Sequence, residues 1–110
     1  MKRYGASAEK VQNIIRFPGL EIDTDQHIVS VSGKKIELTA KEFLLLKYLA
    51  ENKERVYSRD RLLDSVWGID AVIETRTVDV HMRRLREKLK SASHYLKTLH
   101  GVGYKFSEKS

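Results

Sequence analysis

One stretch of the sequence decides between fold classes, and it reads Arg76-Thr77-Val78-Asp79-Val80-His81-Met82-Arg83-Arg84-Leu85-Arg86. At about 100° per residue, four apolar side chains of this stretch and its continuation fall on one side of a helix: Val78, Met82, Leu85 and Leu89. The opposite side carries Arg76, Val80, Arg83, Arg84 and Glu87, with Thr77 and Asp79 at its edges. The pattern predicts a helix that is capped by Thr75, ends near Leu89 or Lys90, and buries one stripe while exposing a basic face.

The exposed face has the chemistry that a helix needs in a DNA major groove. An arginine can fork onto guanine, an acidic side chain can accept from cytosine, and a small apolar group can touch the thymine methyl. Arg76, Arg83 and Arg86 are spread around the helix and can reach phosphates. Two plainer interpretations stay open: a solvated charged surface, and an ordinary ion pair of Asp79 with Arg83 one helical turn away.

Charge and composition narrow the class of protein. Between Arg76 and Lys105 lie eight basic side chains against two acidic ones, an excess equal to the net charge of +6 of all 110 residues. A basic excess confined to one segment is typical of a surface that binds a polyanion.

The absence of cysteine excludes thiolate zinc fingers, disulfide scaffolds and thiol catalysis. The longest apolar run, Phe43–Leu46, is too short to cross a bilayer, so we expect a single cytoplasmic domain without membrane contact.

Two helices are expected before the basic one. Thr39 caps the first helix, Glu42 completes a capping box with it, and the apolar stripe continues until Asn52. Ser58 caps the second helix, which ends at Trp67-Gly68. Two capped helices followed by a basic helix are the order of a helix-turn-helix unit.

Extended segments are expected at both ends of the three helices. From Phe17 to Leu38, alternating residues and a turn at Ser32-Gly33 predict a small antiparallel sheet of two or three strands. Residues 1–16 show no sustained period and are interpreted as an interdomain linker or tail, so the domain is expected to cover residues 17–107.

The C-terminal segment predicts a hairpin. Tyr95–Leu99 and Tyr104–Phe106 flank His100-Gly101-Val102-Gly103, a glycine-rich turn. Such a hairpin carries Lys97, His100 and Lys105 and can place basic side chains on the DNA backbone or in the adjacent minor groove.

Taken in order, these motifs resemble the C-terminal winged-helix DNA-binding (effector) domain of OmpR/PhoB-type response regulators. The resemblance rests on the basic helix and on three further motifs: Leu38-Thr39-Ala40-Lys41-Glu42-Phe43 with Leu45-Leu46, Ser58-Arg59-Asp60-Arg61-Leu62-Leu63 with Val66-Trp67-Gly68, and Thr98-Leu99-His100-Gly101-Val102-Gly103-Tyr104-Lys105-Phe106. It covers about residues 17–107 without a large gap. It implies an α+β fold, a winged helix-turn-helix with an N-terminal antiparallel sheet, three helices and a C-terminal β-hairpin wing.

The resemblance also implies roles for single residues. The positions that face bases in this family are matched by Thr77, Asp79, Val80 and Arg84. The positions that contact the DNA backbone are matched by Trp67, Arg76, His81, Arg83, Arg86, Thr98 and Tyr104. The loop Gly68–Glu74 matches the loop that touches RNA polymerase in activators of the family, and His100 stands where many members carry a wing arginine.

As a whole, the resemblance implies a transcription regulator in a two-component phosphorelay. The chain would bind double-stranded DNA at direct-repeat promoter sites, as a monomer in isolation and a tandem dimer on DNA. The parent chain would carry a receiver domain, joined to the effector domain through residues 1–16.

Other functions have weaker support in the sequence. The four histidines show no metal-ligand spacing and no serine or threonine has a histidine–acid arrangement, so we expect no metal, no cofactor and no enzyme activity. RNA binding is disfavoured because there is no aromatic stacking platform and the RNA major groove is too narrow for the helix. The remaining alternative is a protein-interaction winged helix whose basic stripe docks an acidic partner.

Overall fold

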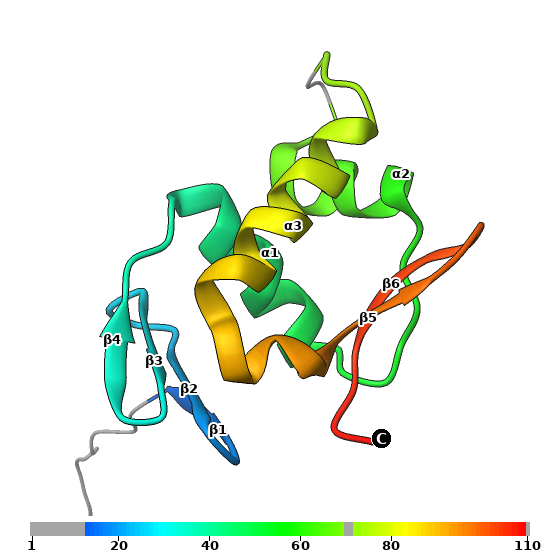
Figure 1. Cartoon of the computed structure of the whole chain (residues 1–110). Helices are drawn as coiled ribbons and strands as arrows, with labels where there is room; N and C mark the ends of the chain where they lie inside the picture. The colour runs from blue at the N-terminus through cyan, green and yellow to red at the C-terminus, as the bar shows by residue number, and fades with distance from the viewer. Residues whose placement is uncertain (1–12, 70–71, 110) are drawn as a thin grey trace, which may run out of the picture.

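The structure, a computed structural model, describes residues 13–69 and 72–109. Three helices lie between an N-terminal sheet and a C-terminal hairpin (Figure 1). The sheet is antiparallel with its strands in sequence order: β1 (Ile14–Phe17), β2 (Leu20–Asp23), β3 (Ile28–Val31) and β4 (Lys34–Ile36). One face of it contributes Leu20, Ile22, Val29 and Val31 to the core. The winged helix-turn-helix architecture expected from the sequence is confirmed.

The sheet is larger than the sequence predicted. It has four strands rather than two or three, and β1 begins at Ile14, three residues before the start of the domain expected from the sequence. β1 pairs in register with β2, which places Ile15 opposite Ile22 and against the core. The strand was missed because, in only four residues, its two adjacent isoleucines obscure the alternation that marks a half-buried strand. Residues 1–12 of the expected linker lie outside the described residues.

Helix α1 (Ala40–Glu51) begins with the predicted capping box. The Glu42 backbone N–H donates to Thr39 Oγ1 at 3.2 Å, and the Thr39 N–H donates to Glu42 Oε1 at 3.0 Å. These two bonds satisfy N–H groups that the helix itself cannot. The helix ends at Glu51, with Asn52 as its C-terminal cap, as expected.

The second helix has the predicted extent but changes geometry midway. Ser58 Oγ accepts from the Arg61 N–H at 3.1 Å and starts α2 (Arg59–Leu62). The helix then widens into a π-helical turn, η2 (Leu63–Trp67), which is closed by a bond from the Gly68 N–H to the Leu63 carbonyl at 3.0 Å. Gly68 has a φ of +108°, which a side chain would disfavour, and the helix stops there.

Helix α3 (Arg76–Leu89) starts without the side-chain cap expected from Thr75. Thr75 has helical backbone angles (φ −61°, ψ −25°), whereas a capping residue is extended. Backbone carbonyls replace the cap: Glu74 accepts from the Thr77 N–H and Thr75 from the Val78 N–H, both at 3.0 Å. A 3-10 helix, η3 (Lys90–Tyr95), then leads into the hairpin strands β5 (Leu96–Leu99) and β6 (Gly103–Phe106).

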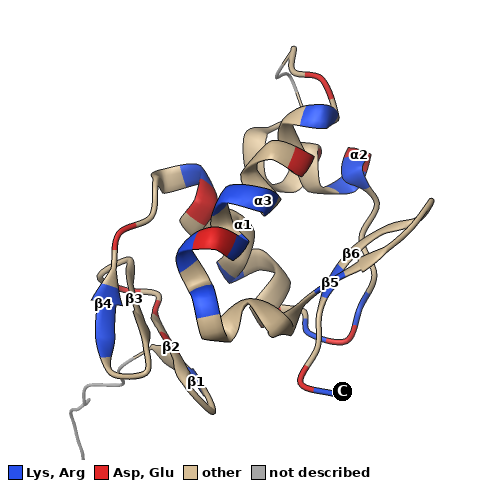
Figure 2. Cartoon of the chain, in the orientation of Figure 1, with Lys and Arg blue, Asp and Glu red and all other residues tan. Residues whose placement is uncertain are grey.

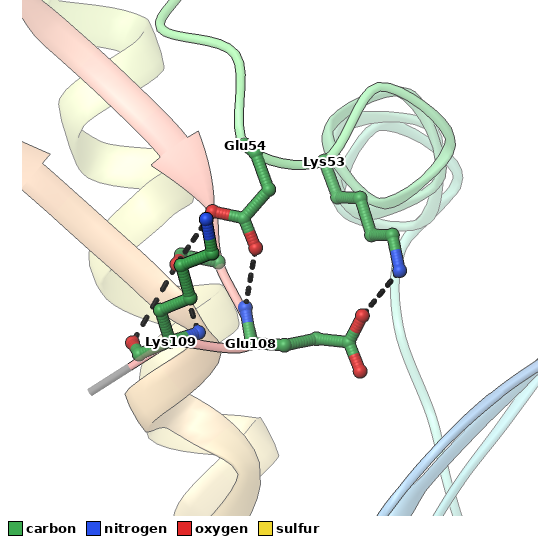
Figure 3. Close-up of polar contacts among 5 residues, drawn as sticks. Lys53, Glu54, Glu108 and Lys109 are labelled. Carbon is green, nitrogen blue, oxygen red and sulfur yellow. Dashed lines mark hydrogen bonds and ion pairs between the residues drawn. The ribbon is translucent and has the colours of Figure 1, made fainter.

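Two groups of contacts hold the N-terminal sheet and the segment after β6 to the rest of the fold. Phe106 lies with its ring centroid 4.7 Å from that of Phe17 and 5.0 Å from that of Tyr95, so aromatic packing joins the sheet to the base of the hairpin. Past β6, the Glu54 carboxylate accepts from Ser107 Oγ at 2.8 Å and from the Glu108 N–H at 3.0 Å (Figure 3). The C-terminal segment is therefore fastened to the connection between α1 and α2.

None of the helices in the described ranges is long and apolar enough to pass through a membrane.

Candidate nucleic-acid interface

Helix α3 lies in the middle of the molecule, flanked by α2 and the hairpin (Figure 1). Its predicted apolar stripe is confirmed, because each member is no more than 1% exposed: Val78, Met82, Leu85 and Leu89. The stripe anchors α3 in the same core that receives the apolar side of α1. Burial of this side turns the opposite side of α3 outward.

The outward side of α3 carries most of the residues that the sequence assigned to DNA. Three arginines are exposed, Arg76, Arg83 and Arg84, together with Glu87. Thr77 and Val80 are half-buried. Figure 2 shows basic segments on α3, on α2 and on the hairpin strands, and also on β4 of the distant sheet. The exposed arginines therefore lie on the side of α3 opposite its buried stripe, and α2 and the hairpin lie next to this helix.

Asp79 is held by partners far away in the sequence. Arg59 at the start of α2 donates from Nε to Asp79 Oδ1 at 2.7 Å, and the Tyr104 hydroxyl of β6 donates to the same oxygen at 2.5 Å. The ion pair of Asp79 with Arg83, left open by the sequence, is replaced by the pair with Arg59. The reason is geometric: Asp79 sits at the edge of the outward face, next to α2 and the hairpin.

The electrostatics of this group favour a charged carboxylate. Burial alone would raise the pKa of the Asp79 carboxyl, but the hydrogen bonds from Tyr104 and Arg59 and the charge of Arg59 hold it below its ordinary value. Burial and the bond to Asp79 raise the pKa of the Tyr104 hydroxyl, which stays protonated as the donor. The group is a donor–acceptor–donor chain that joins α2, α3 and β6.

Three residues predicted to contact the DNA backbone are engaged within the protein. Arg86 donates to the Leu96 carbonyl at 3.0 Å and to Thr98 Oγ1 at 2.6 Å. Tyr104 is 5% exposed, and its ring lies 5.7 Å from the guanidinium carbons of both Arg59 and Arg86. The structure thus brings Arg86, Thr98 and Tyr104 together, where they hold the hairpin against α3.

Trp67 and His81 also meet. Their rings pack edge to face, with centroids 5.0 Å apart and planes at 84°, and both side chains are half-buried. His81 Nδ1 lies 2.9 Å from the Thr77 carbonyl of the preceding helical turn. The pair fixes the end of η2 against α3, and both residues lie at the margin of the outward surface.

The basic residues of the hairpin do not all face α3. Lys97 and Lys105 are directly opposite in the β5–β6 register. Side chains alternate along a strand, and Thr98 and Tyr104 are the ones that contact α3, so the two lysines project from the other face of the hairpin. His100 lies exposed in the turn at the hairpin tip. The three residues predicted for the wing are therefore split between its tip and the face turned away from α3.

Arg59 is the member of this surface to which the sequence assigned no role. It directly follows the cap of α2, a position at which charged residues are commonly exposed and without a special role. Its partner Asp79 is 20 residues away, so no helical or strand periodicity connects the two. Only the packing of α2 beside α3 brings them together.

The comparisons with known proteins agree with the fold and the surface. Residues 33–106 match the family described as "Transcriptional regulatory protein, C terminal". The transcriptional regulatory protein SrrA of Staphylococcus aureus is 44% identical, over 94% of this chain and 45% of the relative. The response regulator DrrB of Thermotoga maritima, an OmpR/PhoB homolog, is 36% identical with a TM-score of 0.79, over 86% of this chain and 44% of DrrB. The RstA DNA-binding domain of Klebsiella pneumoniae, solved in complex with the RstA box, is 33% identical with a TM-score of 0.76, over 86% of this chain and 97% of that domain.

The class that the fold and surface define is a winged-helix output domain. The chain belongs to the family of transcriptional regulatory C-terminal domains, as a DNA-binding output domain of the OmpR/PhoB type of response regulator. It spans less than half the length of SrrA.

Proposed function

We propose that this domain binds double-stranded DNA at promoter sites in a sequence-specific way and thereby regulates transcription in a two-component system. The observation that carries the proposal is the outward side of α3, where Arg83 and Arg84 are exposed while the opposite side is anchored in the core. An anchored helix with free guanidinium groups can enter a major groove without rearranging the fold. With promoter DNA as its ligand, the domain would act in the cytoplasm.

The residues of the surface receive different tasks in this proposal. Base reading falls to residues at the middle and edges of the outward side: Thr77, Asp79, Val80 and Arg84. Backbone contacts fall to residues around them: Trp67, Arg76, His81, Arg83, Arg86, Thr98 and Tyr104. The wing residues in this proposal are Lys97, His100 and Lys105. The two lysines add positive charge to the hairpin, which strengthens binding to any DNA sequence.

A selection of duplexes from random DNA, followed by two arginine variants, tests the proposal. The wild-type domain should enrich one half-site motif. Arg84→Ala should cost roughly 1–3 kcal/mol and relax the preference at one base pair, because a bidentate arginine discriminates bases. Arg83→Ala, the matched control one residue away, should weaken binding to all sequences alike.

Two outcomes would overturn the proposal. Absence of any enriched duplex would do so, and so would DNA affinity that neither variant changes. Binding of the wild-type domain to an acidic protein in place of DNA would instead support the interaction module that the sequence left open.

Further partners are proposed from the loop after η2 and from the length of the relatives. Ile69 and Val72 are 82% and 101% exposed, and two apolar side chains this exposed favour a protein contact, which we assign to RNA polymerase through residues 68–74; Asp70 and Ala71 lie outside the described residues. Because the chain spans 45% of SrrA, we assign a receiver domain to the parent chain, joined to this domain through the segment before β1. Two such domains would lie in tandem on direct repeats.

A further inference from the structure

The Asp79 side chain of α3 is held by residues from two other segments. Three segments meet at its carboxylate: the first residue of α2, the first turns of α3, and β6. Arg59 and Tyr104 both donate to Oδ1, at 2.7 and 2.5 Å. Two donors on one oxygen fix the direction of the carboxylate plane as well as its position.

Both donors are themselves fixed. The Tyr104 ring is 5% exposed, and the guanidinium carbons of Arg59 and Arg86 each lie 5.7 Å from its centroid. Arg86 is held in turn by Thr98 Oγ1 and the Leu96 carbonyl of β5. The backbone of Tyr104 is bonded to Tyr57 on the other side, with N···O distances of 2.9 and 3.0 Å. A displacement of the hydroxyl would therefore require the hairpin to shift.

The held carboxylate remains accessible. The Asp79 side chain is 38% exposed, although it forms an ion pair and accepts a second hydrogen bond. A carboxylate discriminates cytosine by accepting from its exocyclic amine, and this depends on where the acceptor is presented. A carboxylate oxygen held to within about half an ångström can favour one base. A carboxylate that is free to change rotamer can contact several different bases.

We propose that Arg59 and Tyr104 are specificity-determining positioning residues, which set the base preference of Asp79 without touching the base themselves. The inference rests on the proposed function, since it concerns how the same surface reads DNA. For Tyr104, this task replaces the backbone contact that the proposed function assigned to it from the family resemblance. The two tasks make opposite predictions for removal of the hydroxyl.

The test measures the affinity of the full chain for its selected half-site and for duplexes in which each base pair is replaced in turn. Asp79→Ala should reduce discrimination at one base pair roughly 5- to 100-fold. Tyr104→Phe, which removes only the hydroxyl, should reduce discrimination at that same base pair about 2- to 10-fold. Arg59→Lys keeps the charge and should give a smaller loss than Arg59→Ala. The base pair read by Arg84 should keep its preference in each variant.

Coupling between the residues provides the sharpest readout. In the Asp79→Ala background, Tyr104→Phe should cause no further loss of base preference, because the group that it positions is gone. A merely structural role for Tyr104 would lower all affinities in either background. Thermal unfolding shows whether each variant is folded. If Asp79→Ala does not fold, Asp79→Asn replaces it in the experiment.

The inference is overturned if Tyr104→Phe lowers affinity equally for every duplex, which is the result that a phosphate contact predicts. It is also overturned if Asp79→Ala leaves every base preference intact. Failure of the proposed function looks different, because the wild-type domain would then show no preference at any base pair.

Discussion

Gly103 is a residue at which the hairpin lies close against the backbone of the segment before α2. A Cβ atom placed there would lie 2.0 Å from the Tyr57 carbonyl oxygen, a contact that no folded protein tolerates. The same carbonyl accepts the Tyr104 N–H at 3.0 Å, and the Tyr57 N–H donates to the Tyr104 carbonyl at 2.9 Å. The absence of a side chain at residue 103 therefore lets β6 dock on the segment before α2.

Replacement of this glycine should undock the hairpin. Gly103→Ala is expected to destabilise the domain by about 1–3 kcal/mol, because backbone has to move to admit the methyl group. Hydrogen exchange should then show lost protection at the Tyr57 and Tyr104 amides. Gly101→Ala is the matched control: its φ of +78° makes alanine strained, but no atom lies within 4 Å of the added Cβ. Unchanged protection of the Tyr57 amide in Gly103→Ala would contradict this account.

Single residues also show where sequence reasoning stops. The buried stripe of α3 follows from helical periodicity, and so does the exposure of Arg83 and Arg84. The partners of Asp79 do not, since they are 20 and 25 residues away and the sequence suggested only its helical neighbour Arg83. Which residues of the surface read bases stays a prediction.

At the scale of elements, an ion pair between a buried carboxylate of α1 and a half-exposed lysine of α3 joins these two helices. Glu42 is 1% exposed, and its Oε1 accepts from Lys88 Nζ at 2.7 Å and from the Thr39 N–H at 3.0 Å. Burial alone would raise the pKa of Glu42, but the bonds from Lys88 and Thr39, with the positive charge of Lys88, hold it below its ordinary value of 4.5. The glutamate of the capping box of α1 thus also anchors the last turns of α3.

This pair should make the stability of the domain depend on acidity. The pKa of Glu42 is lowered on folding, so its contribution is complete above about pH 4.5 and is lost as pH falls from there through the folded pKa. Glu42→Gln should lower the free energy of unfolding at pH 7 by about 1–3 kcal/mol and flatten its fall as the pH drops below about 4.5. Chemical denaturation at a series of pH values measures both effects.

A second glutamate of α1 provides the control for that experiment. Glu51 is exposed at the end of the helix, and Glu51→Gln should change stability by no more than about 0.5 kcal/mol. Part of the acid dependence should persist in Glu42→Gln, because Asp79 and Glu54 also have lowered pKa values. An acid dependence identical to that of the wild type would show that Glu42 makes no such contribution.

Elements were predicted well where one local signal dominates. The capping box of α1 and the stripe of α3 are local patterns, and both are confirmed. β1 was missed because its pairing with β2, and not its own alternation, makes it a strand. The prediction of a side-chain cap at Thr75 was wrong because Thr75 itself has a helical backbone conformation.

For the whole molecule, the basic excess and the position of α3 together predict how binding responds to salt. The net charge of +6 is contributed by the segment that forms α3, η3 and the hairpin. About six phosphate contacts would release condensed counterions, so the logarithm of the binding constant should fall with the logarithm of salt concentration at a slope near −5.

A titration of duplex binding between about 50 and 200 mM salt measures that slope. Arg83→Ala should reduce its magnitude by about one, because one phosphate contact is lost. Glu51→Gln changes an exposed charge on α1, away from this surface, and should leave the slope unaltered. A slope near zero for the wild type would contradict binding to the DNA backbone.

The docked hairpin has a consequence for the thermodynamics of binding. Two guanidinium groups lie over the Tyr104 ring, the hydroxyl donates to Asp79, and the backbone is bonded to Tyr57. The helices α2 and α3 and the wing therefore already share one geometry in the free protein. Conformational entropy that a loose wing would lose on contact with a ligand is lost here during folding. Association with DNA then orders mainly the exposed arginine side chains. A larger part of the free energy of each new contact therefore contributes to the affinity.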